Sequence, residues 1–329
     1  MIPADLPRFP LAQLPTPIEP LDRLTKLLGG PRILIKRDDL TGLAMGGNKT
    51  RKLEFLVGEA LAQGADTLLT AGAAQSNHCR QTAAAAARAG LRCELVLGGE
   101  PPGVAEGNLL LDGLFGANIH WAGPDRRGET LEAVAAETRT SGRKPYVIPY
   151  GGSNPTGAAG YAFALIELVQ QSGKTSIDID AIIFPSSSGG TQAGLIAGAA
   201  ITGFKGRIIG IGIDKRDRKD VSLKAEVEEL SRQTFRLLAP SSGIRPAGAE
   251  IDESYLGGGY GVVGDPEREA IRLLARTEGI LLDPVYSGRA MAGFIDMIRH
   301  KRFGPGTTVL FWHTGGTPAL FAYARDLAG

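Results

Sequence analysis

The sequence predicts an α/β protein with mostly parallel sheets, organised in about two domains. Short runs rich in β-branched residues alternate with longer Ala- and Leu-rich segments of helical period. Strands that alternate with helices of ten or more residues form βαβ units, in which the strands lie parallel. The chain has 329 residues, enough for two domains at the usual ~150 residues each. Its 43% hydrophobic and 22% charged residues are ordinary for a folded protein.

The first half of the chain sets this alternation. Residues 33–35 read as a strand, and residues 51–63 as a helix because apolar side chains recur on one face, namely Leu53, Leu56, Val57, Ala60 and Leu61. A buried strand is predicted over 67–71, an alanine-rich helix over 77–89, a strand over 93–97 and a helix over 107–115. The segments 118–121, 129–141 and 146–148 continue the pattern as strand, helix and strand.

The second half repeats it with longer helices. A helix is predicted over 154–171, a strand over 181–184, a helix over 190–201 and a buried strand over 208–213. Helices are predicted over 266–278, 288–300 and 317–327, with a strand over 309–312 between the last two. We find no internal repeat of 20–50 residues and no heptad pattern, so repeat and coiled-coil architectures are not expected.

Composition argues against several classes of function. The 36 Lys and Arg against 35 Asp and Glu give a net charge of +1, without the basic excess of a nucleic-acid binder. No run of about 18 apolar residues and no apolar segment of a signal peptide occur, so we expect a cytoplasmic protein without a membrane span. The four histidines lack metal-ligand spacing. Cys79 and Cys93 are expected to be free thiols.

Three glycine- and hydroxyl-rich loops each follow a predicted strand and open a predicted helix. They cover residues 70–77, 185–191 and 313–317. Ligands of open parallel sheets bind at the carboxyl ends of the strands, and helix N-termini offer free N–H groups with partial positive charge. The Ser188-Gly189-Gly190-Thr191 turn is therefore a candidate phosphate site, although a plain helix cap explains this turn about equally well.

Two further positions have reactive residue types. Lys49 lies where the 51–63 helix should begin, and burial or a helix N-terminus would lower its pKa toward the range in which a lysine can form a Schiff base. Spacing alone favours a solvated lysine. Ser76 could act as nucleophile, general acid/base or carboxylate anchor, or could simply cap the 77–89 helix. No His and Asp stand in a recognisable triad order.

Together, a series of short motifs resembles the D-cysteine desulfhydrase / 1-aminocyclopropane-1-carboxylate (ACC) deaminase family of pyridoxal 5′-phosphate (PLP) enzymes. The motifs run nearly end to end and include Pro15-Thr16-Pro17, Ile35–Asp39, Gly46–Lys49, Arg51–Glu54, Gln75–His78, Gly151–Asn154, Gly189–Gly194, Gly259–Gly261, Asp283–Tyr286 and His313–Gly316. The resemblance implies the tryptophan synthase β-like fold, with two open twisted, mostly parallel sheets flanked by helices. It also implies a large domain (1–49 and 161–329), a small inserted domain (50–160) and a homodimer.

The resemblance also implies roles for single residues. Lys49 would hold PLP covalently and act as base at Cα, with Ser76, Tyr260 and Tyr286 as the other catalytic residues. Cofactor contacts are implied for Asn48, Lys49, Asn77, Ser188, Gly189, Gly190, Thr191, Ser287 and Thr314. In this set Asn77 would contact the 3′-oxygen of PLP, and the Thr314 hydroxyl its pyridine nitrogen. Substrate contacts are implied for Gln75, Ser76, Asn77, Tyr260 and Tyr286. No metal is expected.

The implied reaction is α,β-elimination on a small amino acid, with D-cysteine giving pyruvate, hydrogen sulfide and ammonia. ACC deaminases typically carry Glu directly after the tyrosine that corresponds to Tyr286, whereas this chain has Ser287. This difference favours the desulfhydrase over the deaminase. An L-cysteate sulfo-lyase, an ACC deaminase and a PLP-binding protein with little turnover remain as alternatives.

Overall fold

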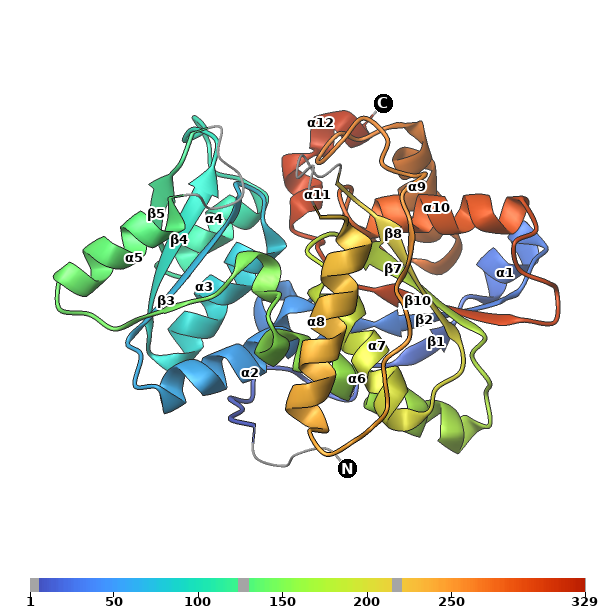
Figure 1. The fold of residues 1–329 in the computed structure, drawn as a ribbon. Coiled ribbons are helices and arrows are strands. Elements are labelled where there is room, and N and C mark those ends of the chain that lie inside the picture. Colours follow the sequence, from blue (N-terminus) through green and yellow to red (C-terminus); the bar gives the residue numbers. More distant parts are fainter. Residues whose placement is uncertain (1–5, 124–129, 215–220, 329) are drawn as a thin grey trace.

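The computed structural model describes residues 6–123, 130–214 and 221–328, which form two sheets with helices packed on their faces (Figure 1). The larger sheet has the order β1-β2-β10-β7-β8-β9 and the smaller one β5-β4-β3-β6. Only β1 runs antiparallel, against β2, and the other pairs are parallel. The predicted fold class of two mostly parallel sheets flanked by helices is thereby confirmed.

All four strands of the smaller sheet lie between β2 and β7 in the chain. The strands are β1 (Ile18–Pro20), β2 (Arg32–Arg37), β3 (Thr67–Ala73), β4 (Arg92–Gly98), β5 (Asn118–Trp121), β6 (Pro145–Val147), β7 (Ala181–Ser186), β8 (Arg207–Gly212), β9 (Glu250–Asp252) and β10 (Thr308–His313). In Figure 1 the smaller sheet, with β3, β4 and β5, stands apart from the larger one. The domain boundaries near residues 50 and 160 stay a prediction.

The helices are α1 (Asp22–Leu28), α2 (Lys49–Ala62), α3 (Asn77–Ala89), α4 (Gly107–Leu114), α5 (Leu131–Thr140), α6 (Pro155–Thr175), α7 (Gly190–Thr202), α8 (Leu223–Leu238), α9 (Asp265–Glu278), α10 (Ser287–Arg299), α11 (Ala319–Ala322) and α12 (Ala324–Leu327). Most predicted helices are found within a few residues of their expected bounds. The predicted start of one at residue 129 lies outside the described residues. The single helix predicted over 317–327 is wrong, because Tyr323 leaves helical geometry (φ −108°, ψ 19°) and separates α11 from α12.

Alternation along the strands of the larger sheet builds a core on each of its faces. Ile33, Ile35, Ile183 and Phe311 pack with α1, α9 and α10 on one face. Their neighbours in sequence pack with α6, α7 and α8 on the other face, among them Leu34, Ile182, Phe184, Leu310 and Trp312. Successive side chains of a strand point to opposite faces, so a strand covered on both faces is mostly apolar, as β7 is from Ala181 to Pro185.

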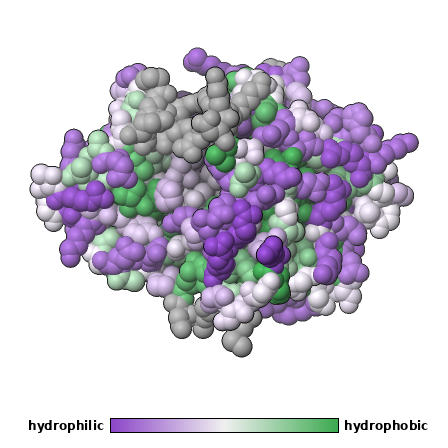
Figure 2. Space-filling view, viewed as in Figure 1, coloured by the Kyte–Doolittle hydropathy of each residue, from purple (hydrophilic) through white to green (hydrophobic). Residues whose placement is uncertain are grey.

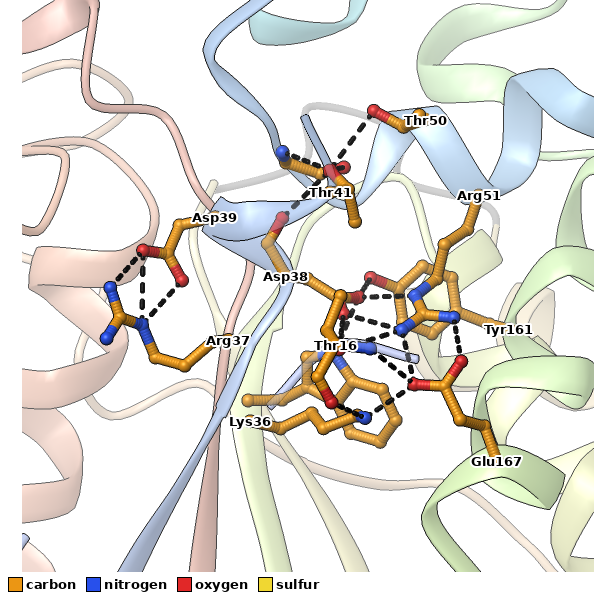
Figure 3. A network of polar contacts seen from close by, with 12 residues as sticks. Thr16, Lys36, Arg37, Asp38, Asp39, Thr41, Thr50, Arg51, Tyr161 and Glu167 are labelled. Atoms are coloured by element: carbon orange, nitrogen blue, oxygen red, sulfur yellow. Dashed lines mark hydrogen bonds and ion pairs between the residues drawn. The ribbon is translucent and has the colours of Figure 1, made fainter. Parts of the chain in front are cut away.

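A buried network of charges ties the first turns of α2 to the larger sheet (Figure 3). The carboxylate of Asp38, just after β2, has no exposure to solvent. Its Oδ1 accepts hydrogen bonds from Thr16 Oγ1 and Arg51 Nη2, both at 2.9 Å. Its Oδ2 accepts from Arg51 Nε at 2.9 Å, Tyr161 Oη at 2.6 Å and Trp312 Nε1 at 2.8 Å. Five donors thus converge on one carboxylate.

Glu167 on α6 completes the network. It accepts from Arg51 through two hydrogen bonds of 2.9 and 3.0 Å, and Lys36 Nζ lies 2.5 Å from its Oε1. Two cations therefore face two anions, of which only Glu167 is partly exposed, with 14% of its side chain open to solvent. Burial alone would raise the pKa of Asp38, but the Arg51 guanidinium holds it below its ordinary value.

Figure 2 shows one face of the molecule, on which hydrophilic residues cover most of the view and hydrophobic residues show in separate small areas. Within the described ranges, no helix combines the length and apolar character needed to cross a membrane.

Candidate active site

A cavity lies at the carboxyl ends of β3, β7 and β10, where the three glycine- and hydroxyl-rich loops were predicted. Its described lining comprises Asn48, Lys49, Ser76, Asn77, His78, Tyr150, Gly151, Pro185, Ser186, Ser187, Ser188, Gly189, Thr191, Gln192, Tyr286 and Thr314. Most of the predicted site residues are therefore gathered in one place. Gln75, Gly190, Tyr260 and Ser287 are not among the lining residues, and their positions are described below.

Lys49 is the first residue of α2. The tight turn before it depends on Gly46 and Gly47, because their φ angles of 69° and 129° are unfavourable for any residue that has a Cβ atom. Lys49 Nζ donates a hydrogen bond to the carbonyl oxygen of Gly151 at 3.2 Å. Burial lowers the pKa of Lys49 to about 8, because a low-dielectric environment disfavours the charged amine. About a tenth of this amine is then neutral at pH 7, far more than for a lysine with the ordinary pKa of ~10.4.

Lys52 is a second buried amine, next to the cavity but not among its lining residues, and the sequence predicted no role for it. It lies one turn after Lys49, so both side chains share a face of α2. Lys52 Nζ donates to the same Gly151 carbonyl oxygen at 3.0 Å and lies 3.5 Å from Ser153 Oγ. It is also so close to the 188–191 turn that a Cβ at Gly190 would lie 2.7 Å from Nζ. Burial, and next the neighbouring Lys49, lower its pKa well below the ordinary value.

The 188–191 turn opens α7, a helix of 13 residues. Gly189 has a left-handed φ of 81°, and the N–H of Gly190 donates to Ser153 Oγ at 3.2 Å. Ser153 Oγ in turn donates to Ser188 Oγ at 2.8 Å. Backbone N–H groups, hydroxyls and the Lys52 amine thus converge where the helix dipole favours an anion. The predicted helix began at residue 51, whereas α2 begins at Lys49; a start two residues earlier would have put Lys49 and Lys52 on one helix face.

Asn48 links α2 to α7. Its Nδ2 donates to Thr191 Oγ1 at 3.2 Å, and its backbone N–H donates to the Thr314 carbonyl oxygen at 3.0 Å. The residue before the reactive lysine therefore ties together the loops that follow β7 and β10. Thr314 lines the cavity, and its hydroxyl has no hydrogen-bond partner among the residues that the structure describes.

Ser76 caps α3 and lines the cavity as well. Its Oγ accepts a hydrogen bond from the N–H of Cys79 at 3.2 Å, so the capping interpretation of this serine is correct without excluding a role toward a ligand. Gln75 faces away from the cavity and is held by α4 and the residue before it. Its Nε2 donates to the Glu106 carbonyl oxygen at 3.0 Å, and its Oε1 accepts from the N–H of Asn108 at 2.9 Å.

The two predicted tyrosines, Tyr260 and Tyr286, form a pair at the N-terminus of α10. Their hydroxyl oxygens lie 2.6 Å apart and their rings meet edge to face with centroids 5.9 Å apart. Tyr286 lines the cavity, and Tyr260 stands behind it. Burial raises the pKa of both phenols well above the ordinary value. Both are therefore neutral near pH 7, and one of the two hydroxyls donates to the other.

Ser287 turns away from the cavity toward a buried carboxylate. Its hydroxyl donates to Asp283 Oδ1 at 2.6 Å and accepts from the N–H of Asp283 at 2.8 Å. Asp283 also accepts from the N–H groups of Val285, Tyr286 and Ser287. The cofactor contact implied for Ser287 thus stays a prediction, because this hydroxyl is engaged at the start of α10.

Comparison with known proteins agrees with this geometry. Residues 10–315 match a family described as pyridoxal-phosphate dependent enzyme. A crystal structure of an ACC deaminase homologue superposes with a TM-score of 0.89 at 38% identity, over 99% of this chain and 96% of that one. Threonine deaminase isoform 2 of Solanum lycopersicum gives 0.69 at 18% identity, over 96% and 83%. An L-serine ammonia-lyase of Rhizomucor miehei gives 0.67 at 17%, over 97% of each chain.

The cavity fits the cofactor of this family. PLP has an aldehyde, which the Lys49 amine can bind, and a phosphate, for which the 188–191 turn and the Lys52 amine provide donors and positive charge. Asn77 and Thr314 offer polar side chains to the ring between them. Within the described part of the chain, no group of three or more His, Cys, Asp or Glu side chains is arranged to hold a metal ion. The chain belongs to the family of pyridoxal-phosphate-dependent enzymes, and its cofactor is PLP.

Proposed function

We propose that this enzyme eliminates the β-substituent of a small amino acid, with D-cysteine as its substrate and pyruvate, hydrogen sulfide and ammonia as products. The observation that carries the proposal is the Lys49 amine, which lines the cavity and whose pKa is lowered to about 8. When bound, PLP withdraws electrons from Cα of the amino acid and so makes its proton removable. A neutral amine at Lys49 is the group that accepts this proton.

The other residues act by position. The Lys52 amine and the 188–191 turn hold the phosphate, which fixes the ring relative to Lys49. Ser76 is held at the N-terminus of α3, where its hydroxyl and the free N–H groups of the helix can receive the substrate carboxylate. The neutral Tyr286 lines the cavity as well, and its hydroxyl is held by that of Tyr260 at 2.6 Å. These groups orient the substrate and keep water from the reacting carbon.

Position 287 supports a substrate that has a Cα proton. ACC has none, and its ring opening in the ACC deaminases goes with a glutamate at this position. Here Ser287 donates to Asp283 at 2.6 Å inside the protein. A glutamate would bring a second carboxylate against the buried Asp283, whose pKa burial already raises. The surroundings of position 287 thus suit serine and favour the elimination of a thiol.

The two alternative substrates differ in what the cavity would have to supply. ACC deamination is favoured by the 38% identity to an ACC deaminase homologue. L-Cysteate has a sulfonate in addition to its carboxylate, which calls for a further cation. Among the described lining residues, Lys49 alone has an ammonium or guanidinium group. Burial lowers the pKa of His78 well below its ordinary value, so that this imidazole is neutral.

Turnover of a substrate panel tests the proposal. The PLP-loaded enzyme is given D-cysteine, β-chloro-D-alanine, L-cysteate and ACC, and 2-oxo acid and sulfide are measured. We expect 2-oxo acid from D-cysteine and β-chloro-D-alanine, with sulfide from D-cysteine only. Faster 2-oxo acid formation from ACC or L-cysteate would replace the proposal by that alternative. Without product from any of the four, the chain would be a PLP-binding protein with little turnover.

The Lys49→Ala variant is the matched control for this panel. It should lose all four activities together with the absorbance band near ~420 nm of lysine-bound PLP, which borohydride reduces. We further propose that the enzyme is a cytoplasmic homodimer, as the family resemblance implies. Sedimentation equilibrium of the PLP-loaded protein measures the mass of the assembly, and a monomer would contradict this part of the proposal.

A further inference from the structure

Asn77 has a side chain whose two ends face different partners. Its Oδ1 accepts a hydrogen bond from Arg80 Nη1 and another from Asn108 Nδ2, both at 2.9 Å. Its Nδ2 has no hydrogen-bond partner among the residues that the structure describes, and the residue lines the cavity. The nitrogen lies beside the loop after β10, since a Cβ at Gly316 would be 2.8 Å from it.

The direction of this amide follows from the chemistry of Arg80. A guanidinium has five N–H donors and no acceptor. The atom of Asn77 that faces it must therefore be the oxygen, and the nitrogen must take the opposite side. The same reasoning fixes Asn108, whose Oδ1 accepts from Arg80 Nη1 at 2.6 Å. Its Nδ2 is thereby turned toward Asn77 Oδ1 and the Gln75 carbonyl oxygen, each at 2.9 Å.

Both supporting side chains are anchored and closed to solvent. Arg80 and Asn108 have no exposed surface. Arg80 Nη2 donates to the carbonyl oxygen of Gly46 at 2.9 Å, in the turn that precedes Lys49. The backbone N–H of Asn108 donates to Gln75 Oε1 at 2.9 Å. The first turns of α3 and α4 and the turn before α2 are thus joined through one guanidinium.

We propose that Arg80 and Asn108 are positioning residues, which lock the Asn77 amide with its Nδ2 toward the cavity, so that this position accepts only a hydrogen-bond acceptor of the bound cofactor. The phenolic oxygen of PLP is such an acceptor, and the resemblance implies that it is the one that Asn77 contacts. The inference rests on the cofactor site proposed above and deepens it. Neither Arg80 nor Asn108 touches the cofactor. Each acts through Asn77, whose free rotation would otherwise offer the oxygen as often as the nitrogen.

The donor has an effect that can be measured apart from turnover. An N–H donor stabilises the ionised form of an oxygen acceptor. A locked Asn77 therefore favours the phenolate of the bound cofactor, and this form sets the position and the pH dependence of its absorbance band. Loss of the lock should move the apparent pKa of that band and weaken PLP, whereas a merely structural defect would lower the amount of folded protein.

A double-mutant cycle tests the proposal. PLP affinity and the pH titration of the absorbance band are measured for the wild type, Asn108→Ala, Asn77→Ala and the double variant. Each single change should weaken PLP about three- to tenfold, the effect of about one hydrogen bond. Because Asn108 acts through Asn77, Asn108→Ala should add almost nothing in the Asn77→Ala background. Multiplied effects of the two changes, or an unchanged titration of Asn108→Ala, would overturn the proposal.

Arg80→Met is measured in the same cycle, and Asn108→Ser serves if Asn108→Ala does not fold. Asn118→Ala is the matched control, because Asn118 is an exposed asparagine of β5, in the smaller sheet, with side-chain hydrogen bonds to Glu94 and His120. It should leave affinity and titration unchanged. Mass spectrometry of borohydride-reduced wild type distinguishes the two levels. PLP attached elsewhere than Lys49 would refute the proposed site, whereas PLP at Lys49 with independent effects would refute only the lock.

Discussion

Replacing Asp38 by asparagine tests whether the buried charge network holds α2 in place. The substitution keeps the shape of the side chain but turns one of its two acceptors into a donor. Five donors converge on the two oxygens of the carboxylate. Whichever way the asparagine amide is turned, its NH2 group replaces one of these oxygens and leaves the donors on that side without an acceptor. The Arg51 guanidinium keeps only Glu167 as its anionic partner.

The cost can be estimated from this geometry. Hydrogen bonds to a charged group contribute about 1.5–3 kcal/mol each, and breaking a buried ion pair from one side costs about 3–5 kcal/mol. Because these terms describe the same contacts, we expect a loss of about 3–5 kcal/mol in the free energy of unfolding. For a chain of 329 residues, an unfolding entropy of about 2.1 cal/mol/K per residue converts this to a Tm about 4–7 °C lower.

Urea unfolding followed by circular dichroism measures the difference at several pH values. The pKa of Asp38 is lowered in the folded protein, so its contribution is fully present above the unfolded pKa of ~3.9 and is lost as the pH falls through the lower folded value. The two proteins should therefore differ fully at pH 6–8 and converge only in strong acid. Asp265→Asn is the control, since the side chain of Asp265 is 98% exposed. An Asp38→Asn protein as stable as this control would refute the reasoning.

Three further predictions concern single residues near the cavity. Lys52→Met should weaken PLP about 100-fold, the size of a charge-assisted contact to phosphate, as measured by fluorescence titration. Ser76→Ala should lower the rate of elimination about tenfold or more and the stability by about 1 kcal/mol through loss of the α3 cap; unchanged kinetics would remove Ser76 from the catalytic residues. Asp112 is buried without a hydrogen-bond partner and burial raises its pKa to about 8, so the folded protein is penalised increasingly from pH ~4 to 8. Asp112→Asn should thus raise Tm most at pH 8 and least near pH 4, in thermal scans at both pH values.

The sequence was sufficient for the strands of both sheets that carry the site, since β3, β7 and β10 show apolar runs followed by glycine-rich loops. It was insufficient for β1 and β9, which have three residues each and are too short to show a period. The break between α11 and α12 falls at Tyr323, where no glycine or proline signals the end of a helix. Local patterning therefore identifies the layers better than their edges.

For the site, the motifs pointed to Lys49, Asn77 and Ser188, which all line the cavity, because loops at the carboxyl ends of neighbouring parallel strands lie at the same edge; their roles stay predictions. They did not reveal the roles of Lys52, Ser153 or Asn108. The role of Lys52 depends on which way its face of α2 points. The roles of Ser153 and Asn108 depend on contacts between segments far apart in sequence. The orientation of Ser287 toward Asp283 likewise depends on the local path of the chain at the start of α10.

Two amines share the carbonyl oxygen of Gly151, and this has a consequence for how the enzyme takes up its cofactor. Burial lowers the pKa of both amines, and the neighbouring Lys49 lowers that of Lys52 further, so the protein disfavours two protonated amines at this oxygen. A phosphate dianion next to Lys52 reverses that preference, so cofactor loading draws a proton from solution. Affinity for PLP should then decline as the pH rises, because the phosphate favours the protonated Lys52 amine and the protein alone does not keep that proton.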